Sequence, residues 1–313
     1  MLVALTGASG LIGSHTIMAL RRMGHQVRAQ VRPTTRRDHI APYVDQWCVG
    51  DQANPQVQAA LVRGVDAVIH NAVDWEALAR APLPHFEKNV LGALALLEAA
   101  RLSGVPQFIF VSSVAAYHHI LPGGIITENH PTWPGSIYGA SKAAVEAHLK
   151  AYHTTYGMNT SAWRPASVYG MDPNLGRCQW VELVKAARDG QTIDTDQGGK
   201  ITHVLDAAEA LALAVGDAGV AGEFYNIVDG YLYWQEVAQI AKDLCGSAAI
   251  IENRKGSGPR NQFDGTKAIA FFERHANNVA LRRGVEGVRS YVRQLLQRLS
   301  TAPDNWQPSA GSL

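Results

Sequence analysis

The sequence predicts an α/β fold: a Rossmann-type, doubly wound parallel sheet with a smaller, less regular C-terminal part that binds substrate. Three observations support this prediction. In the first half of the chain, short apolar runs alternate with helix-like stretches, and the first run, Leu2–Thr6, leads directly into a glycine-rich turn. After Pro165 the alternation weakens. Apolar strands that alternate with helices are typical of a parallel sheet covered by helices on both faces.

The bounds of the predicted elements follow from the spacing of their apolar residues. Strands are predicted at 2–6, 26–31, 47–49, 67–70, 108–112, 160–164 and 224–228, and helices at 10–23, 88–102, 138–156, 179–189, 205–215, 236–245 and 285–299. We expect a Rossmann domain over residues 1–170, with segments near 200–228 returning to it, a mainly substrate-binding part over 171–300, and a loose tail over 301–313. Ligands of such sheets bind at the carboxyl ends of the strands, so the loops that follow the strands are the candidate site.

The composition argues against several classes of function. The 313 residues include 28 basic and 27 acidic side chains, a net charge of +1, so no overall field attracts nucleic acid or an anionic membrane. The three cysteines lie far apart and form no metal-ligand spacing, which favours a reducing compartment and predicts no metal site. No apolar run approaches the ~18 residues of a membrane span. We expect a cytoplasmic protein whose partner is a small-molecule substrate.

The glycine-rich turn reads Thr6-Gly-Ala-Ser-Gly-Leu-Ile-Gly13 and lies between a predicted strand and a predicted helix. Gly7 allows a tight turn, Gly10 lets a pyrophosphate approach the backbone, and Gly13 permits close packing of the helix on the strand. The helix N-terminus adds free N–H groups and the positive end of a dipole. This context predicts that the turn binds a dinucleotide. The other residues expected to contact it there are Ser9, Leu11 and Ile12.

The end of the second strand indicates which dinucleotide binds. NAD enzymes usually carry an Asp or Glu at this point, for the adenosine ribose hydroxyls. This chain has Gln30-Val-Arg32-Pro followed by Arg36 and Arg37, with no acidic residue before Asp38. The planar cationic group of Arg32 suits a 2′-phosphate, and Arg36 could assist it. We therefore predict NADP, with NAD less favoured; a solvated basic loop is the alternative.

Three further residues follow predicted strands and could contact the dinucleotide. Asp51 is placed to bind the adenine amino group, and Asn71 and Ala72 would form the wall beneath the adenosine and phosphates. Asp and Asn are also common turn formers at strand ends, which is the alternative for each of them.

The motif Tyr138-Gly-Ala-Ser-Lys142 places a phenol and an ammonium one helical turn apart on one face. A phenol has a pKa near 10 and is a poor base at neutral pH, but a nearby positive charge stabilises the phenolate. Ser113, at the end of the fifth predicted strand, could donate a hydrogen bond to a substrate oxygen. The three residues predict acid–base chemistry beside the dinucleotide. An exposed Tyr/Lys pair and a strand-end serine cap are the alternatives.

With these motifs, the chain resembles an extended short-chain dehydrogenase/reductase of the NAD-dependent epimerase/dehydratase family. The segments Asn89–Gly92, Arg164–Gly170, His203–Asp206 and Phe224–Asn226 add to the resemblance, which covers about residues 1–295. It implies Tyr138 as the acid/base, with Lys142 and Ser113 as its partners, and a homodimer paired through the helices at 88–103 and 138–156. It further implies cofactor contacts from Asn89, Ser112, Pro165, Ala166 and Val168.

Departures from the family pattern bear on the substrate. The basic end of the second strand resembles the dihydroflavonol-reductase and 3β-hydroxysteroid-dehydrogenase branch, and Gly199 stands where the epimerases carry an Arg that grips a diphosphate. The dehydratases carry a Thr and acidic residues where this chain has Ser113-Val-Ala. Arg260 could still hold one phosphate. Four residues are expected to border the substrate pocket: Asp74, Trp75, His118 and His119.

The main functional prediction is an NADP-dependent oxidoreductase that transfers a hydride between the nicotinamide and a carbonyl or secondary alcohol of a small substrate. Two alternatives stay open. One is a sugar or sugar-nucleotide epimerase that retains its NAD. The other is a regulator that binds NADP without turning it over, although such relatives usually lose the Tyr or the Lys.

Overall fold

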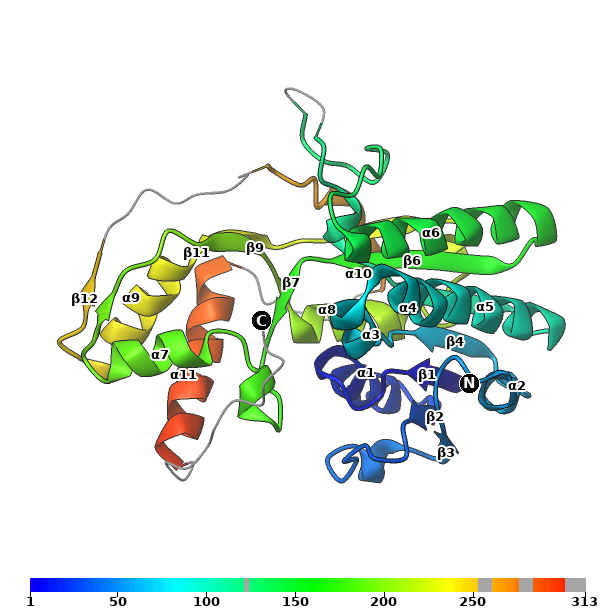
Figure 1. Ribbon diagram of the computed structural model, residues 1–313, viewed down its shortest axis with the longest axis horizontal. Helices are drawn as coiled ribbons and strands as arrows, with labels where there is room; N and C mark the ends of the chain where they lie inside the picture. The colour runs from blue at the N-terminus through cyan, green and yellow to red at the C-terminus, as the bar shows by residue number, and fades with distance from the viewer. Residues whose placement is uncertain (121–123, 253–260, 276–283, 302–313) are drawn as a thin grey trace.

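Seven parallel strands form the main sheet of the computed structural model, which describes residues 1–120, 124–252, 261–275 and 284–301 (Figure 1). The strand order is β3-β2-β1-β4-β5-β6-β10. Strands β2 and β3 therefore lie on one side of β1, and β4 and the later strands lie on its other side. Every pair of neighbours is parallel. The predicted Rossmann-type fold is confirmed. The strands are β1 Leu2–Thr6, β2 Gln26–Val31, β3 Gln46–Val49, β4 Ala67–His70, β5 Gln107–Val111, β6 Asn159–Pro165 and β10 Phe224–Ile227.

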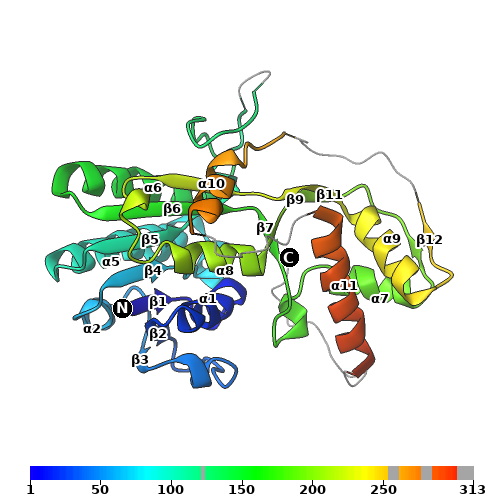
Figure 2. The same ribbon diagram turned by 180° about the vertical axis from the view of Figure 1, so that it is seen from behind.

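Helices cover both faces of the main sheet (Figures 1 and 2). One layer contains α1 (Leu11–Arg22), α8 (Val204–Leu213) and α10 (Thr266–His275), whose apolar residues form a core with β1 and β2. The opposite layer contains α2 (Pro55–Val62), α5 (Gly92–Leu102) and α6 (Ile137–Tyr156). A π-helical turn over Glu87–Leu91 leads into α5. Because helices cover both faces, the central strands such as β4 and β5 are buried along their whole length, and the loops at the strand ends are free to form a site.

The C-terminal part has a core of its own, beside the carboxyl ends of the main strands (Figure 1). Tyr169, Trp180 and Tyr291 pack at its centre. The short elements α3 (Trp75–Arg80) and α4 (Pro82–Phe86) belong to the main part instead. The C-terminal part is built from a three-stranded sheet of β7 (Ser167–Tyr169), β9 (Gly198–His203) and β11 (Gly230–Tyr233), a two-stranded sheet of β8 (Thr192–Ile193) and β12 (Ile250–Ile251), and the helices α7 (Val181–Arg188), α9 (Trp234–Cys245) and α11 (Gly284–Thr301).

Two predictions from the sequence concern residues that the structure does not describe. The tail from residue 302 onward and Arg260 lie outside the described residues. Within the described ranges, no helix is both long and apolar enough to cross a membrane.

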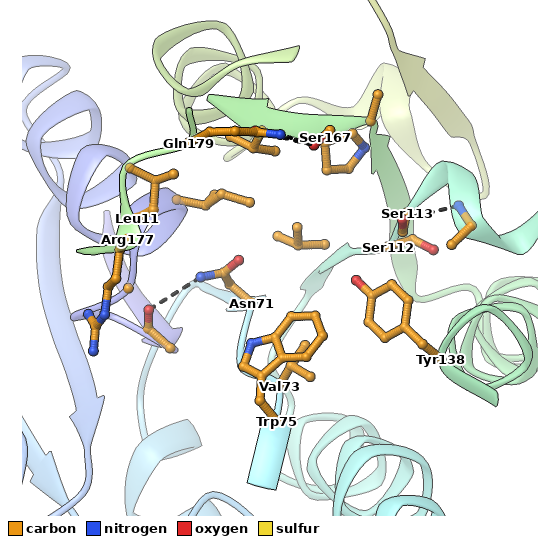
Figure 3. A pocket seen from close by; sticks show the side chains of 18 of the residues that line it. Leu11, Asn71, Val73, Trp75, Ser112, Ser113, Tyr138, Ser167, Arg177 and Gln179 are labelled. Carbon is orange, nitrogen blue, oxygen red and sulfur yellow. Dashed lines mark hydrogen bonds between the residues drawn. The ribbon is translucent and has the colours of Figure 1, made fainter. Parts of the chain in front are cut away.

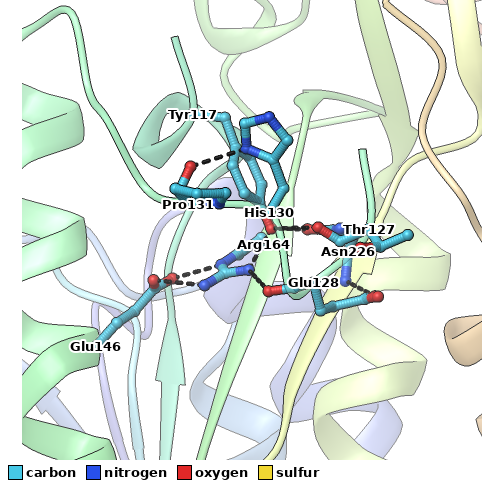
Figure 4. Close-up of polar contacts among 8 residues, drawn as sticks. All are labelled: Tyr117, Thr127, Glu128, His130, Pro131, Glu146, Arg164 and Asn226. Carbon is cyan, nitrogen blue, oxygen red and sulfur yellow. Dashed lines mark hydrogen bonds and ion pairs between the residues drawn. The ribbon is translucent and has the colours of Figure 1, made fainter. Parts of the chain in front are cut away.

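A buried ion pair attaches α6 to the sheet (Figure 4). Arg164 of β6 donates from Nε and Nη2 to the two carboxylate oxygens of Glu146, at 2.8 and 2.7 Å, and both side chains are at most 3% exposed. Arg164 Nη1 also donates to the Tyr117 hydroxyl, which in turn donates to Asn226 Oδ1 at 3.0 Å. The network joins α6, β6, β10 and the segment after β5, so it fixes the position of the helix that carries Tyr138 and Lys142.

We predict that Glu146→Gln lowers the free energy of unfolding by about 3 kcal/mol or more, because it removes the carboxylate that is hydrogen-bonded to the buried Arg164 guanidinium. Urea denaturation measures the change. Glu76→Ala is the matched control, since the pair of Glu76 with Arg80 is 72% and 67% exposed and should contribute little. The double variant Glu146→Leu/Arg164→Met should recover most of the loss. Equal effects of Glu146→Gln and the control would contradict the structural role of the pair.

Candidate active site

A large cleft, of about 1530 Å³, lies between the carboxyl ends of the main strands and the C-terminal part. Pockets for one small ligand usually measure ~300–1,000 Å³, so this cleft has space for a dinucleotide and a second ligand. Its walls come from the loops after strands β1 to β6. Further lining residues lie in 176–183, 197–200 and 261–263. The cleft therefore occupies the edge at which ligands of doubly wound sheets bind.

The glycine-rich turn forms one end of this cleft. Gly7 has a φ of 66°, and a Cβ there would lie 2.9 Å from the backbone of Ala72. A Cβ on Gly13 would lie 2.1 Å from the Gly7 carbonyl oxygen, so Gly13 serves packing and does not itself line the cleft. Helix α1 begins after Gly10 with no side-chain cap and no acidic residue in its first turn. Free N–H groups are therefore available to an anion. The turn lines the cleft with Gly7, Ser9, Gly10, Leu11 and Ile12.

Asn71 and Ala72 line the cleft beside the turn and are tied to it by hydrogen bonds. Asn71 Nδ2 donates to the Gly7 carbonyl at 3.3 Å, and the backbone N–H groups of Asn71 and Ala72 both donate to Thr6 Oγ1 at 3.1 Å. Thr6 Oγ1 also bonds His70 Nδ1 at 2.8 Å, and burial lowers the pKa of His70 to about 3. Hydrogen bonds among Thr6, the neutral His70 ring and Asn71 therefore hold the loop after β1 against the loop after β4. This is the wall that the sequence predicts beneath the phosphates.

Arg32 and Asp51 line the far end of the cleft, where the sequence places the adenosine. The Arg32 side chain is exposed. Asp51 accepts from Lys88 Nζ at 2.8 Å and from the Ala53 N–H at 2.8 Å. Partial burial opposes ionisation, yet the bond from Lys88 keeps the pKa of the Asp51 carboxyl below its usual value. Asp51 is thus an ionised acceptor at this end.

Besides Gly13, two residues expected to contact the cofactor do not line the cleft. Arg36 is exposed, and its guanidinium lies 3.9 Å from Asp38. Asn89 instead braces the loop after β4: its Oδ1 accepts from the Asp74 N–H at 2.7 Å, and its Nδ2 donates to the Asp74 carbonyl at 3.1 Å. The motif that contains Asn89 therefore acts on loop geometry, and direct contact of either residue with a dinucleotide remains only a prediction.

The structure brings Ser113, Tyr138 and Lys142 to one wall of the cleft (Figure 3). Helix α6 can start this close to the segment after β5 because Gly139 has no Cβ. A Cβ at this position would lie 2.0 Å from the Ala115 carbonyl oxygen. Burial raises the pKa of Tyr138 to about 12, and the hydrogen bond with Ser113 opposes that rise. Tyr138 is therefore a neutral phenol at physiological pH unless a further positive charge comes close.

Lys142 is buried on the same wall, with 5% of its surface exposed. Its Nζ donates to the Val111 carbonyl at 2.7 Å and lies 4.6 Å from the centroid of the Phe110 ring. Burial lowers the pKa of Lys142 to about 7, although the Glu146 carboxylate favours the charged form. The ammonium therefore gains or loses its proton near neutral pH, next to the candidate acid/base.

The remaining predicted cofactor residues also line the cleft. Ser112 contributes a buried Oγ that has no hydrogen-bond partner among the described residues, which fits a site made for a polar ligand. Ala166 is positioned by its N–H bond to Thr202 Oγ1, at 2.8 Å. The other two residues on this side are Pro165 and Val168. Together with the glycine cradle, the orphan hydroxyl indicates that the residues present suit a nicotinamide dinucleotide.

Of the four residues expected to border the substrate pocket, Asp74, Trp75 and His118 line the cleft, whereas His119 does not. The Trp75 indole stacks on the Tyr138 ring, with centroids 5.2 Å apart and an angle of 26° between the planes (Figure 3). Trp75 is 59% exposed, so its indole also meets the open cleft. The described residues contain no group of three or more potential metal ligands around the two histidines or elsewhere.

Sequence reasoning missed the contribution of residues 176–183, which carry Arg177, Gln179 and Trp180 into the cleft wall. Trp180 has a φ of 65°, in the left-handed region that a bulky residue seldom adopts. No motif marks this segment, and it reaches the cleft because the C-terminal core packs beneath it.

The pKa of Lys142 generates a prediction about stability. Between pH 7 and 10.5 the unfolded chain holds more protons than the folded one, because the folded pKa is about 7 against an ordinary 10.5. The wild type should gain up to ~1.4 kcal/mol of stability per pH unit in this window relative to Lys142→Met, and none below it. Unfolding at pH 6, 7.5 and 9 measures the difference. Lys150→Met, an exposed site on the same helix, is the control. A pH-independent difference would contradict burial of the charge.

The comparisons with known proteins agree with the geometry. Residues 3–228 match the model of the NAD dependent epimerase/dehydratase family. A dTDP-glucose 4,6-dehydratase of an Actinoplanes species is 30% identical over 297 residues, 85% of this chain and 90% of that protein. A UDP-glucose 4-epimerase of Corynebacterium glutamicum is 28% identical over 301 residues, 88% of each chain.

Solved structures resemble the whole described fold. The UDP-glucose 4-epimerase of Thermus thermophilus, in complex with NAD, has a TM-score of 0.74 at 27% identity and covers 94% of this chain and 99% of its own. The dTDP-glucose 4,6-dehydratase of Streptomyces venezuelae, also with NAD, has a TM-score of 0.75 at 27% identity and covers 96% and 98%. The resemblance inferred from the motifs is thereby confirmed at the level of the family, and the reductase branch remains a prediction. The chain belongs to the NAD-dependent epimerase/dehydratase family.

Proposed function

We propose that this chain is an epimerase-type enzyme that oxidises and re-reduces a secondary hydroxyl of a sugar nucleotide, using a nicotinamide dinucleotide that it does not release. The observation that carries the proposal is the meeting of Ser113, Tyr138 and Lys142 on the wall of a cleft whose other end is the glycine-rich turn. The relatives favour this alternative over a reductase for a small apolar substrate, since they are a sugar-nucleotide dehydratase and sugar-nucleotide epimerases.

The dinucleotide, when bound, would supply a hydride acceptor and, in its oxidised form, a positive charge. The turn from Gly7 to Ile12 would hold its phosphates, and Asp51 its adenine. Tyr138 would take the proton of the substrate hydroxyl at its phenolic oxygen. It would return the proton after the oxidised sugar has rotated to present its other face. Ser113 would hold that same substrate oxygen, and the Lys142 ammonium would favour the phenolate. Trp75 would exclude water from one face of the phenol.

Epimerisation is favoured over loss of water because no carboxylate follows Ser113. The carboxylates that line the described cleft have other partners: Asp51 pairs with Lys88, Asp74 caps helix α3 through the Ala77 N–H at 2.9 Å, and Glu182 lies 3.6 Å from Lys185. Elimination of water from a sugar needs a positioned general acid, which Val114 and Ala115 cannot supply.

The test is incubation of the purified protein with UDP-glucose or dTDP-glucose, with and without added NAD. We expect an epimer of the sugar nucleotide by anion-exchange chromatography, with no net change in absorbance from the reduced dinucleotide. Tyr138→Phe should lower the rate by about a hundredfold or more while dinucleotide binding is retained. Tyr156→Phe, an exposed tyrosine of the same helix, is the control. Stoichiometric accumulation of reduced dinucleotide, or a dehydrated product, would refute the proposal.

A second candidate, a net NADP-dependent oxidoreductase for a carbonyl or secondary alcohol, is favoured by one observation. Strand β2 ends at Val31, and Arg32 follows it on the cleft wall where a carboxylate would bind the ribose of NAD. A guanidinium at this point is suited to a 2′-phosphate and offers nothing specific to a ribose hydroxyl pair. An enzyme that must exchange its dinucleotide would benefit from such selectivity.

We expect Arg32→Ala to weaken NADPH binding by about tenfold to a hundredfold, because a charge-assisted bond to phosphate contributes ~1.5–3 kcal/mol, and to leave NADH binding unchanged. Fluorescence titration with each reduced dinucleotide gives both dissociation constants. Arg36→Ala is the control, since Arg36 does not line the cleft. Wild-type protein that binds NADH more tightly than NADPH would eliminate the second candidate.

A further inference from the structure

Arg177 reaches from the C-terminal part to the glycine-rich turn. It ends the 3₁₀ turn Leu175–Arg177 in the loop between β7 and α7, and its Nη1 donates to the Ser9 carbonyl oxygen at 3.4 Å. Both residues line the cleft, and in Figure 3 Arg177 lies beside Leu11, across the cleft from Tyr138. This contact therefore joins the two walls at the end of the cleft that holds the phosphate-binding turn.

The bond to Ser9 does not by itself explain the position of the guanidinium. A distance of 3.4 Å is long for an N–H···O bond, and a guanidinium has five N–H donors to satisfy. The Arg177 side chain is exposed, and no ion pair holds it anywhere in the described ranges. Its position is thus set by the loop that carries it.

That loop is fixed by its own contacts. Asn174 Oδ1 accepts from the Gly176 N–H at 3.1 Å, and Asp172 Oδ1 accepts from the Asn174 N–H at 2.8 Å. Cys178, immediately after Arg177, is buried and accepts at Sγ from the Asp172 N–H at 3.2 Å. Arg177 is consequently held between a capped turn and the C-terminal core, so its aim at the turn after β1 is built into the fold.

The Arg177 guanidinium lies near a second positive group, the N-terminus of helix α1. The N-terminus of α1 begins at Leu11, next to Ser9, with free N–H groups, no side-chain cap and no acidic residue in the first turn. A helix N-terminus is equivalent to about half a positive charge, which repels a guanidinium. Two positive groups that converge in this way become favourable when a multivalent anion binds between them, and a diphosphate matches a planar guanidinium in charge and geometry.

We propose that Arg177 binds the diphosphate of the dinucleotide from the side opposite the glycine-rich turn, so that the C-terminal part closes over the cofactor and slows its release. The inference rests on the proposed dinucleotide site and extends it: it assigns a residue of the substrate-binding part to the cofactor. A sugar nucleotide also carries a diphosphate. The contact with Ser9 favours the dinucleotide as the source, and the experiment separates the two.

The test measures binding and release, not turnover. After any retained dinucleotide has been removed, NADH and NADPH are titrated by fluorescence against the wild type, Arg177→Ala, Arg177→Lys and a control. The control is Arg188→Ala, since Arg188 lies on α7 outside the cleft lining and bonds Asp189. We expect Arg177→Ala to weaken binding by about tenfold or more, mainly through faster dissociation in stopped flow, and the Lys variant to lose less. The control should match the wild type in binding, and both Arg177 variants should keep the wild-type melting temperature because the Arg177 side chain is exposed.

Three outcomes would overturn the inference in distinguishable ways. Unchanged dinucleotide affinity and release in Arg177→Ala would show that the guanidinium does not contact the cofactor. Weakened binding of UDP with unchanged binding of NADH and NADPH would assign Arg177 to the substrate diphosphate instead. Failure of the wild type to bind either dinucleotide, with none released from it on denaturation, would refute the proposed function and this inference together.

Discussion

The ion pair between Arg164 and Glu146 is the interaction on which the arrangement of the site depends. It anchors α6 to β6 from within the protein, where the two charges are stable only as a pair. Because Tyr138 and Lys142 lie on that helix, the pair determines where the phenol and the ammonium meet the cleft. Glu146 also favours the charged form of Lys142, one turn away, so the same carboxylate acts on the structure and on the electrostatics of the site.

The sequence was sufficient for the main sheet because its strands are apolar runs bounded by turn residues. Strands β2 and β4 have the predicted bounds, and β5 begins one residue earlier than predicted. Candidate catalytic residues at fixed spacings could also be predicted. Ser113, Tyr138 and Lys142 meet because the carboxyl end of β5 and the start of α6 lie at the same edge of the sheet. These features are local, or depend on topology that the alternation of elements reveals.

What could not be predicted depends on contacts between distant segments. Strand β7 has only three residues, and β9 starts with two glycines, so neither has an alternating pattern. The stacking of Trp75 on Tyr138 and the approach of Arg177 to Ser9 join residues far apart in the chain, and no spacing announces them. The substrate could not be predicted for the same reason, because residues 176–183 of the cleft wall carry no recognisable sequence pattern.

The path of the chain between its two parts has an evolutionary consequence. After β6 the chain enters the C-terminal part at β7, returns to the main sheet through α8 and β10, leaves again at β11, and comes back once more for α10 before α11. No single cut separates the C-terminal part, so it cannot be exchanged between proteins as one contiguous segment. New specificities on this scaffold must instead arise by changes within loops such as the one before α7, while helix α6 stays unchanged.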